Sequence, residues 1–188
     1  MKLNAGTIIA GIVGGGATLL TAVSVPFVAP AFRKVCIPYV PATTQQLENI
    51  RKALSQVKSV GSVIDLGSGD GRVTIHCAKQ GYVSSGVELN RILVWYSKYN
   101  AFKAGSYSNT HFFRQNMFKV DLKKYDSAVL FGAESTMDNL LEKLNEMNVG
   151  SHLVACRFPL PKESDTHWAV KFQGGEGMDA AWLYKKIA

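Results

Sequence analysis

The residues best suited to chemistry lie in one short run, Val63 to Arg72, which reads VIDLGSGDGR. Two β-branched residues and a leucine surround Asp65, which is the composition of a buried parallel strand. Glycines then follow at alternate positions, where the backbone can turn sharply and approach a ligand without a Cβ in the way. A nicotinamide-binding turn has the spacing G-x-G-x-x-G, whereas Arg72 stands here in place of the third glycine. The run predicts a ligand-binding turn of another kind, or a glycine-rich turn that binds nothing.

A second carboxylate follows about 20 residues after this turn. Residues 81–90 read GYVSSGVELN, a short strand pattern that ends in Glu88. One helix, Arg72 to Gln80, fits between the two strands, as in a right-handed parallel crossover. This order places Glu88 beside the glycine turn, where a carboxylate can accept hydrogen bonds from both hydroxyls of a ribose. Taken alone, a glutamate at a strand end is ordinarily solvated. Next to the glycine turn, a ligand contact is the better interpretation.

The amino-terminal part is strongly apolar and carries no charged residue from Ala5 to Phe32. A membrane-spanning helix needs roughly 20 apolar residues, and the stretch up to Pro26 supplies them. It is long for a cleaved secretory signal, and it lacks the polar face of a buried core helix. We therefore expect a single transmembrane anchor with a basic flank over residues 1–34 and a cofactor-binding domain over residues 35–188.

The chain has 188 residues, a net charge of +7 and a hydrophobic content of 47%, which suits one globular domain behind such an anchor. Its lysines are spread over several elements, which argues against a nucleic-acid surface. Attraction of a tethered domain to anionic lipid headgroups is one interpretation, and ordinary solvated lysines are the other. The cysteines lie far apart, no C-x-x-C occurs and the histidines form no ligand-like pair. We therefore expect no metal site and free, buried thiols. No Ser/His/Asp or Cys/His constellation predicts a nucleophile.

Strands and helices alternate after the anchor. Helices are predicted over 45–57, 72–80, 90–104 and 137–147, and strands over 63–66, 83–88, 111–114, 127–131 and 152–156. The first helix has Leu47, Ile50, Leu54 and Val57 on one face, and the third carries Ile92, Leu93, Tyr96 and Tyr99. Segments 168–173 and 180–186 are separated by glycines with no room for a helix, which predicts an antiparallel hairpin.

Five strands alternating with helices and followed by a hairpin form an α/β layout. An acidic residue in the first strand, followed by G-x-G-x-G, is similar to the S-adenosylmethionine (AdoMet) sites of seven-strand methyltransferases. The fold class is therefore expected to be the Rossmann-like class I AdoMet-dependent methyltransferase, preceded by an amino-terminal transmembrane helix.

From Val25 to Tyr184 the chain resembles the small, membrane-anchored mitochondrial protein-lysine methyltransferases, whose members modify the ATP synthase c-subunit or the adenine nucleotide translocase. The resemblance is greatest in residues 26–44, 63–72, 88–90, 93–97, 155–159 and 175–179. The stretch from Arg33 to Thr44 is most similar to the members that modify the c-subunit. The resemblance implies AdoMet as cofactor, a lysine acceptor in a membrane-embedded protein, and the mitochondrial inner membrane as location.

The motif and the resemblance together give a set of expected cofactor contacts. Asp65, Gly67, Gly69 and Gly71 should meet the methionine part, Glu88 the ribose, and Asn116 the adenine, where such enzymes usually have an aspartate. Ser68, Asn90 and Met117 are expected beside them. Methyl transfer mainly requires donor and acceptor to be held about 3–3.5 Å apart, so no catalytic base is obligatory. Glu134, just past the fourth strand, is a candidate acceptor contact or a solvated carboxylate.

Two other functions remain open. A membrane-tethered module could bind AdoMet or a nucleotide without turnover, and it would then bind ligand without methylating any membrane extract. A methyltransferase could instead act on a small lipophilic acceptor such as a quinone or a lipid, and it would then have an apolar tunnel open toward the anchor. Within the resemblance, the translocase is the alternative protein substrate.

Overall fold

The computed structural model describes residues 40–58, 61–132 and 137–188. Residues 39–188 form one compact unit. The expected anchor and the expected domain boundary after residue 34 lie outside the described residues. Within the three described ranges, no helix has the length and apolar character that crossing a bilayer requires.

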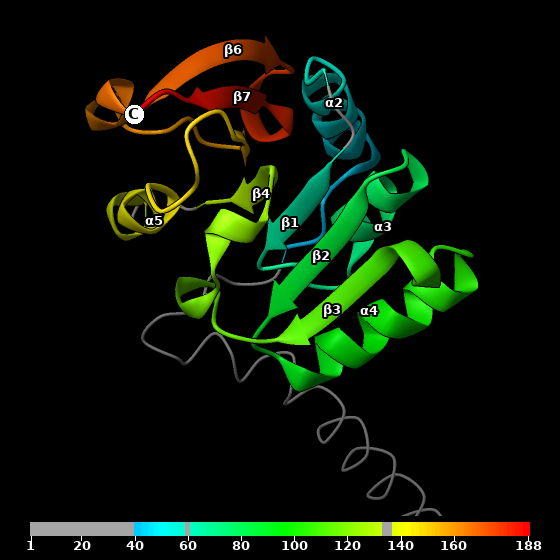
Figure 1. Ribbon diagram of the computed structural model, residues 1–188. Helices are drawn as coiled ribbons and strands as arrows, with labels where there is room; N and C mark the ends of the chain where they lie inside the picture. Colours follow the sequence, from blue (N-terminus) through cyan, green and yellow to red (C-terminus); the bar gives the residue numbers. More distant parts are fainter. Residues whose placement is uncertain (1–39, 59–60, 133–136) are drawn as a thin grey trace, which may run out of the picture. The chain divides into compact units, whose positions relative to one another are not determined.

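The strands of the described residues form one seven-stranded sheet (Figure 1). They are β1 (Ser62–Leu66), β2 (Val83–Glu88), β3 (Thr110–Arg114), β4 (Ser127–Phe131), β5 (His152–Cys156), β6 (Trp168–Gly174) and β7 (Ala181–Lys186). Their order is β3-β2-β1-β4-β5-β7-β6, with β1 to β5 parallel and β7 antiparallel to both β5 and β6. The predicted strands, the terminal hairpin and the seven-strand Rossmann-like arrangement are confirmed.

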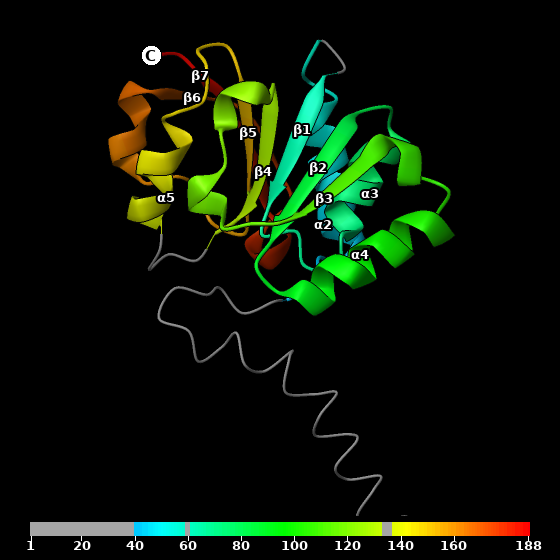
Figure 2. The ribbon, with the colours of Figure 1, turned by 60° about the horizontal axis from the view of Figure 1, so that its bottom comes forward.

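Four α-helices of the described residues flank this sheet. They are α2 (Thr44–Leu54), α3 (Arg72–Lys79), α4 (Arg91–Lys103) and α5 (Met137–Leu144). The crossovers through α3 and α4 run from β1 toward β3, whereas the crossover through α5 runs from β4 toward β5. Right-handed connections therefore place α5 on the opposite face of the sheet from α3 and α4, as Figure 2 shows.

Several connections are made by short 3₁₀ turns. They are η2 (Tyr107–Asn109), η3 (Met117–Lys119), η4 (Leu122–Lys124), η6 (Lys162–Thr166) and η7 (Gly177–Asp179). Thus η3 and η4 join β3 to β4, and η6 joins β5 to β6. The hairpin link between β6 and β7 holds η7, which is a single turn.

Helix α2 begins at Thr44, one residue before the predicted start at residue 45. Thr43 is its N-cap in a capping box: Gln46 N–H donates to Thr43 Oγ1 at 3.0 Å, and Thr43 N–H donates to Gln46 Oε1 at 2.8 Å. The predicted apolar face is confirmed, since Ile50 and Leu54 are fully buried in a cluster with Val63 of β1. The helix ends at Leu54, earlier than predicted.

Helix α4 differs from the sequence interpretation in the face that it buries. Its buried residues are Leu93, Val94, Ser97 and Ala101. Ile92, Tyr96 and Tyr99 are instead 43%, 49% and 59% exposed. When both faces of a helix carry apolar residues, residue type alone does not indicate which face meets the sheet.

Candidate cofactor site at the carboxyl edge of the sheet

The strand order reverses between β1 and β4. In open α/β sheets, ligands bind outside the carboxyl ends of the strands at such a switch point. The glycine turn, residues 67–71, leaves β1 at this edge, and Glu88 ends the neighbouring strand β2. Gly69 N–H donates to Glu88 Oε2 at 3.2 Å, so the two sequence signals are in contact.

The glycines of this turn have different neighbours. Gly67 has a φ of +87°, and a Cβ built there would meet no atom within 4 Å. Gly71 has a φ of +81°, and a Cβ there would lie 2.8 Å from Phe112 Cε1 and from Ser97 Cβ. Gly67 therefore leaves open space for a ligand, whereas Gly71 leaves room for the packing of α4 and β3 against the turn.

Ser68 faces the sheet. A Cβ on Gly86 of β2 would lie 2.8 Å from Ser68 Oγ and from Thr74 Oγ1. Ser68 Oγ is buried and has no hydrogen-bond partner among the described residues, while its backbone N–H donates to Val87 O at 2.9 Å. The side chain thus packs beneath the turn, against β2 and α3.

Glu88 and Asn90 shape the end of β2. Glu88 Oε1 accepts a hydrogen bond from Asn90 N–H at 2.8 Å, in addition to the bond from Gly69 N–H. Each carboxylate oxygen has two lone pairs, so Glu88 can still accept from two ribose hydroxyls. Asn90 is the N-cap of α4, and its Oδ1 accepts a hydrogen bond from Ile92 N–H at 3.0 Å.

Asn116 and Met117 follow β3 at the same edge. Gln115 N–H donates to Glu88 O at 3.2 Å, which brings this segment beside β2. Asn116 Oδ1 caps η3 by accepting from Phe118 N–H at 3.0 Å, and both Asn116 and Met117 are half-buried. The amide oxygen that would accept from an adenine amine therefore already has one donor. Glu134 lies outside the described residues.

Asp65 is a buried carboxyl group, 2% exposed, in β1. Thr74 Oγ1 donates to its Oδ2 at 3.0 Å. Burial raises the pKa of Asp65 to about 7, and the nearby carboxylates of Glu88 and Asp70 act in the same direction. A cationic ligand beside Asp65 would restore its charged form.

Two residues that sequence reasoning missed hold the glycine turn from α4. Ser97 Oγ is buried and lies 2.9 Å from Gly69 O, and Asn100 Nδ2 donates to Asp70 O at 3.0 Å. The sequence offered only a serine among apolar neighbours, because residue type did not indicate which face of the helix meets the sheet. Ser97 Oγ also lies 2.8 Å from Leu93 O of its own helix, so its single hydroxyl proton is shared between a helix carbonyl and the turn.

The chain that enters α2 also lies against this edge. Arg72 Nη2 is 2.6 Å from Asp70 Oδ2, and Arg72 Nη1 donates to Ala42 O at 2.7 Å. Asn49 Nδ2 of α2 donates to Asp179 O at 2.8 Å, which attaches the hairpin loop. Segments far apart in the sequence thus meet beside the glycine turn.

Arg157 is a further missed residue, directly after β5. Among the non-glycine residues that the structure describes, it alone has a positive φ, +72°. Its guanidinium carbon lies 5.3 Å from the ring centroid of Phe131, at the end of β4, and its buried Nε has no hydrogen-bond partner among the described residues. Such strained residues are typical of functional sites. A fixed cation therefore stands at the carboxyl ends of β4 and β5.

Two of the three cysteines lie within the described residues. Cys77 and Cys156 are free and buried, as predicted, and burial raises the pKa of both thiols. Both are therefore neutral and poor nucleophiles. Cys36 lies outside the described residues. Within the described part of the chain, no group of three His, Cys, Asp or Glu residues is placed to hold a metal ion.

Comparisons with known proteins agree with this site. Residues 65–167 match the model of the ANTKMT methyltransferase domain, and residues 2–33 match that of the N-terminal domain of the ATP synthase c-subunit lysine N-methyltransferase. The ATP synthase c-subunit lysine N-methyltransferase of Caenorhabditis elegans is 54% identical, over 99% of this chain and 100% of its own. The Mus musculus adenine nucleotide translocase lysine N-methyltransferase is 35% identical, over 82% of this chain and 67% of its own.

Among solved structures, an RNA methyltransferase from Salinibacter ruber in complex with S-adenosyl-L-homocysteine has a TM-score of 0.68. It is 24% identical and covers 79% of this chain and 94% of its own, which supports the fold. The residues of the site fit AdoMet: there is open space at Gly67, an acceptor for hydroxyls at Glu88 and a buried carboxyl group for a cationic ligand at Asp65. The chain is thus an AdoMet-dependent methyltransferase, and it belongs to the family of ATP synthase c-subunit lysine N-methyltransferases.

Proposed function

We propose that this enzyme transfers methyl groups from AdoMet to a lysine of the ATP synthase c-subunit, at the mitochondrial inner membrane. The observation that carries the proposal is the 54% identity to the C. elegans protein of that name, over 99% of this chain and 100% of the other. The translocase is the alternative substrate, because the family model over residues 65–167 and the mouse relative bear its name.

The cofactor would be held by the residues at the carboxyl edge. We assign Asp65 and the backbone of the glycine turn to the methionine part, Glu88 to the ribose and Asn116 to the adenine. Bound AdoMet supplies an activated methyl group. The chain's own residues then have to orient it and admit the acceptor from the side of β4 and β5.

Arg157 would act on that acceptor side. A lysine side chain has an unperturbed pKa near 10.4 and accepts a methyl group only as the neutral amine. A fixed positive charge close to an amine favours its neutral form and lowers its pKa. Arg157, held over Phe131 at the ends of β4 and β5, would supply that charge to an arriving lysine.

A single-pass anchor over residues 5–26 would hold the enzyme at the membrane. The match of residues 2–33 to the amino-terminal family model supports assigning this segment to the enzyme itself. Tethering raises the effective concentration of a membrane-bound acceptor without any new contact. It also favours lysines at the level of the headgroups.

The test is a reconstitution. The full chain in lipid vesicles is incubated with methyl-labelled AdoMet and either the purified c-subunit or the purified translocase, and the labelled residue is identified by mass spectrometry. We expect label on a lysine of the c-subunit, and much less with Glu88→Ala. Label on the translocase alone, or on extracted lipid or quinone, would contradict the proposal. AdoMet binding without transfer to either protein would support a binding module instead.

A further inference from the structure

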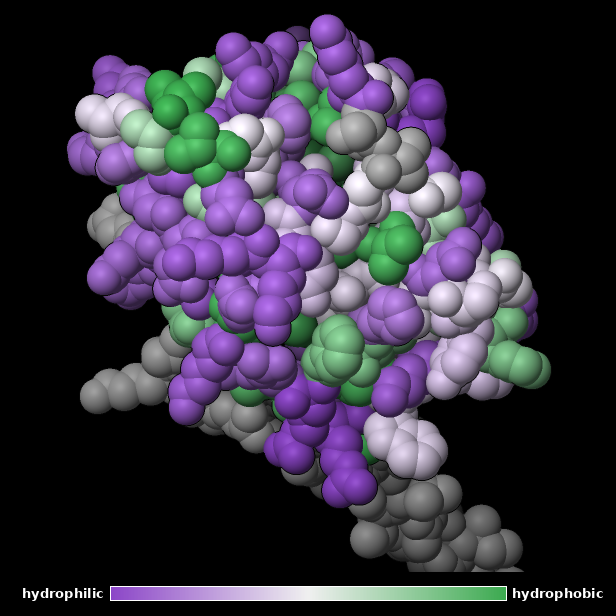
Figure 3. All heavy atoms as spheres, viewed as in Figure 1, coloured by the Kyte–Doolittle hydropathy of each residue, from purple (hydrophilic) through white to green (hydrophobic). Residues whose placement is uncertain are grey.

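One face of α4 is aromatic and exposed to solvent. Trp95, Tyr99 and Phe102 are 70%, 59% and 74% exposed, and Ile92 and Tyr96 lie beside them. Residues 92, 95, 99 and 102 are spaced by three or four, so they form one stripe along the helix. In Figure 3, pale and green spheres gather over α4 at the lower right of the view.

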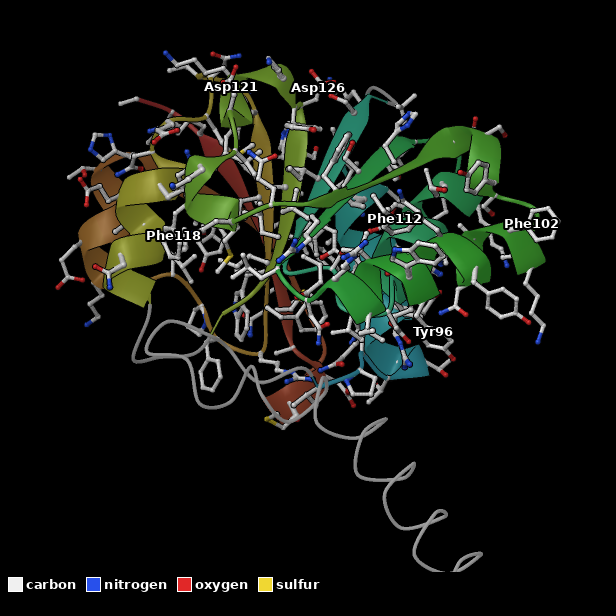
Figure 4. All side chains as sticks on the ribbon, turned by 90° about the horizontal axis from the view of Figure 1, so that it is seen from below. Tyr96, Phe102, Phe112, Phe118, Asp121 and Asp126 are labelled. Carbon is white, nitrogen blue, oxygen red and sulfur yellow. The ribbon has the colours of Figure 1, made fainter. Side chains whose placement is uncertain are left out.

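This stripe lies directly opposite the face that packs on the sheet. The buried face consists of Leu93, Val94, Ser97 and Ala101. In Figure 4, Phe112 of β3 lies between the sheet and α4, whereas Tyr96 and Phe102 point away from the sheet. The outer aromatics therefore contribute nothing to the core of the described domain, and in water they form an exposed apolar patch of the kind that marks an interaction site.

The charges on α4 have a single sign. The helix carries Arg91, Lys98 and Lys103, all exposed, and no acidic residue. On a helical projection, Arg91 and Lys98 lie on one side of the aromatic stripe and Lys103 on the other. Trp and Tyr flanked by Lys and Arg form the composition of helices that lie in the interface of a membrane with anionic lipid.

We infer that the outer face of α4 lies on the bilayer, with the aromatic side chains at the headgroup and acyl boundary and the basic side chains on anionic phospholipid. The inference deepens the membrane location proposed above and rests on it. Helix α4 begins just past Glu88, so its contact with lipid would hold the cofactor edge at the headgroup level. That edge is also where the chain enters α2, through the bond from Arg72 to Ala42 O.

The tryptophans allow a direct test. Trp168 is 1% exposed and Trp182 is half-buried, so Trp95 is the tryptophan placed to meet lipid. The full chain is reconstituted in phosphatidylcholine vesicles with phosphatidylglycerol, and Trp95 emission is taken as the difference from Trp95→Phe. A matched control is Val149→Trp in the Trp95→Phe background. Val149 is 68% exposed, at the turn before β5.

We expect lipid brominated near the headgroup end of its acyl chains to quench Trp95 at least threefold more than the tryptophan at position 149. Aqueous acrylamide should show the reverse order. If acrylamide quenched Trp95 as strongly as the tryptophan at position 149, the inference would be overturned, because the outer face of α4 would then be in water. Shielding from both quenchers would also overturn it, because the stripe would then be covered by protein, such as a second copy of this chain.

The basic residues are tested in the same vesicles. Bromolipid quenching of Trp95 should fall when phosphatidylglycerol is replaced by phosphatidylcholine, and this dependence should disappear in Arg91→Gln/Lys98→Gln/Lys103→Gln. Quenching that is equal in both lipids would contradict the contact with anionic headgroups. Since methylation of the c-subunit is measured separately, a failure of this surface is distinguishable from a failure of the proposed function.

Discussion

Protonation of Asp65 is coupled to the stability of the fold, and we expect it to be coupled to cofactor binding as well. Its pKa in the folded protein is about 7, raised by burial from an ordinary value of 3.8. The folded chain therefore holds a proton that the unfolded chain releases, and stability falls as the pH rises through that interval. AdoMet carries a sulfonium and an ammonium group, so its binding beside Asp65 would favour the carboxylate.

Asp65→Asn should remove this pH dependence. The wild type should lose stability between about pH 4 and pH 7, whereas the variant should not. The difference in free energy of unfolding, variant minus wild type, should therefore rise over this interval and level off above it, as measured by urea denaturation. In wild-type protein near pH 7, AdoMet binding should release protons, so that the calorimetric enthalpy depends on the buffer. If the enthalpy of AdoMet binding did not depend on the buffer, Asp65 would not be a group that releases a proton on binding.

Glu88→Ala tests the ribose contact. Loss of the carboxylate leaves the ribose hydroxyls unpaired and releases Gly69 N–H, so AdoMet binding should weaken by about 1–3 kcal/mol. Glu88→Gln retains one acceptor oxygen and should weaken binding less. The control is Glu163→Ala, an exposed glutamate in η6. Unchanged affinity of Glu88→Ala in calorimetry would remove Glu88 from the site.

Arg157 allows backbone strain to be separated from charge. At its φ of +72°, alanine is strained and glycine is not, so Arg157→Gly should be about 1–2 kcal/mol more stable than Arg157→Ala. Both variants lack the guanidinium over Phe131, and both should lose methyl transfer to the same degree while binding AdoMet normally. Arg157→Lys, which keeps the charge, should retain more activity. Full activity in Arg157→Gly would contradict a role on the acceptor side.

At the scale of elements, the glycine turn offers a matched pair of substitutions. Both Gly67→Ala and Gly71→Ala strain a positive φ, at about 1–2 kcal/mol each. Only Gly71→Ala also forces a Cβ against Phe112 and Ser97, so it should lower the thermal midpoint more. Gly67→Ala should instead lose AdoMet affinity with a smaller loss of stability. Equal effects of the two substitutions on both measurements would contradict the different roles assigned to these glycines.

The sequence predicts the elements well because their signals are local. The strand ending in Glu88 and the helix predicted from residue 45 follow from residue type and spacing. The contacts between elements are not local. The hydrogen bond from Asn100 to the turn and the positive φ of Arg157 depend on how α4 and β5 pack, and no pattern in one segment specifies them. The exposed face of α4 was missed for the same reason.

At the scale of the whole molecule, the carboxyl edge gathers segments that are far apart in the chain. Arg72, at the end of the glycine turn, donates a hydrogen bond to the backbone of residue 42. Asn49 of α2 donates to the hairpin loop, and Asn100 of α4 donates to the glycine turn. Residue 42, at the start of the described chain, therefore lies beside the glycine turn.

The central claim is that this enzyme methylates a lysine of the ATP synthase c-subunit. The most direct measurement is mass spectrometry of the c-subunit and of the translocase, purified from cells in which the gene is deleted. We predict that a lysine of the c-subunit loses its methylation, that the wild-type gene restores it and that Glu88→Ala does not, while the translocase is unchanged. Full methylation of the c-subunit in the deleted cells would contradict the account.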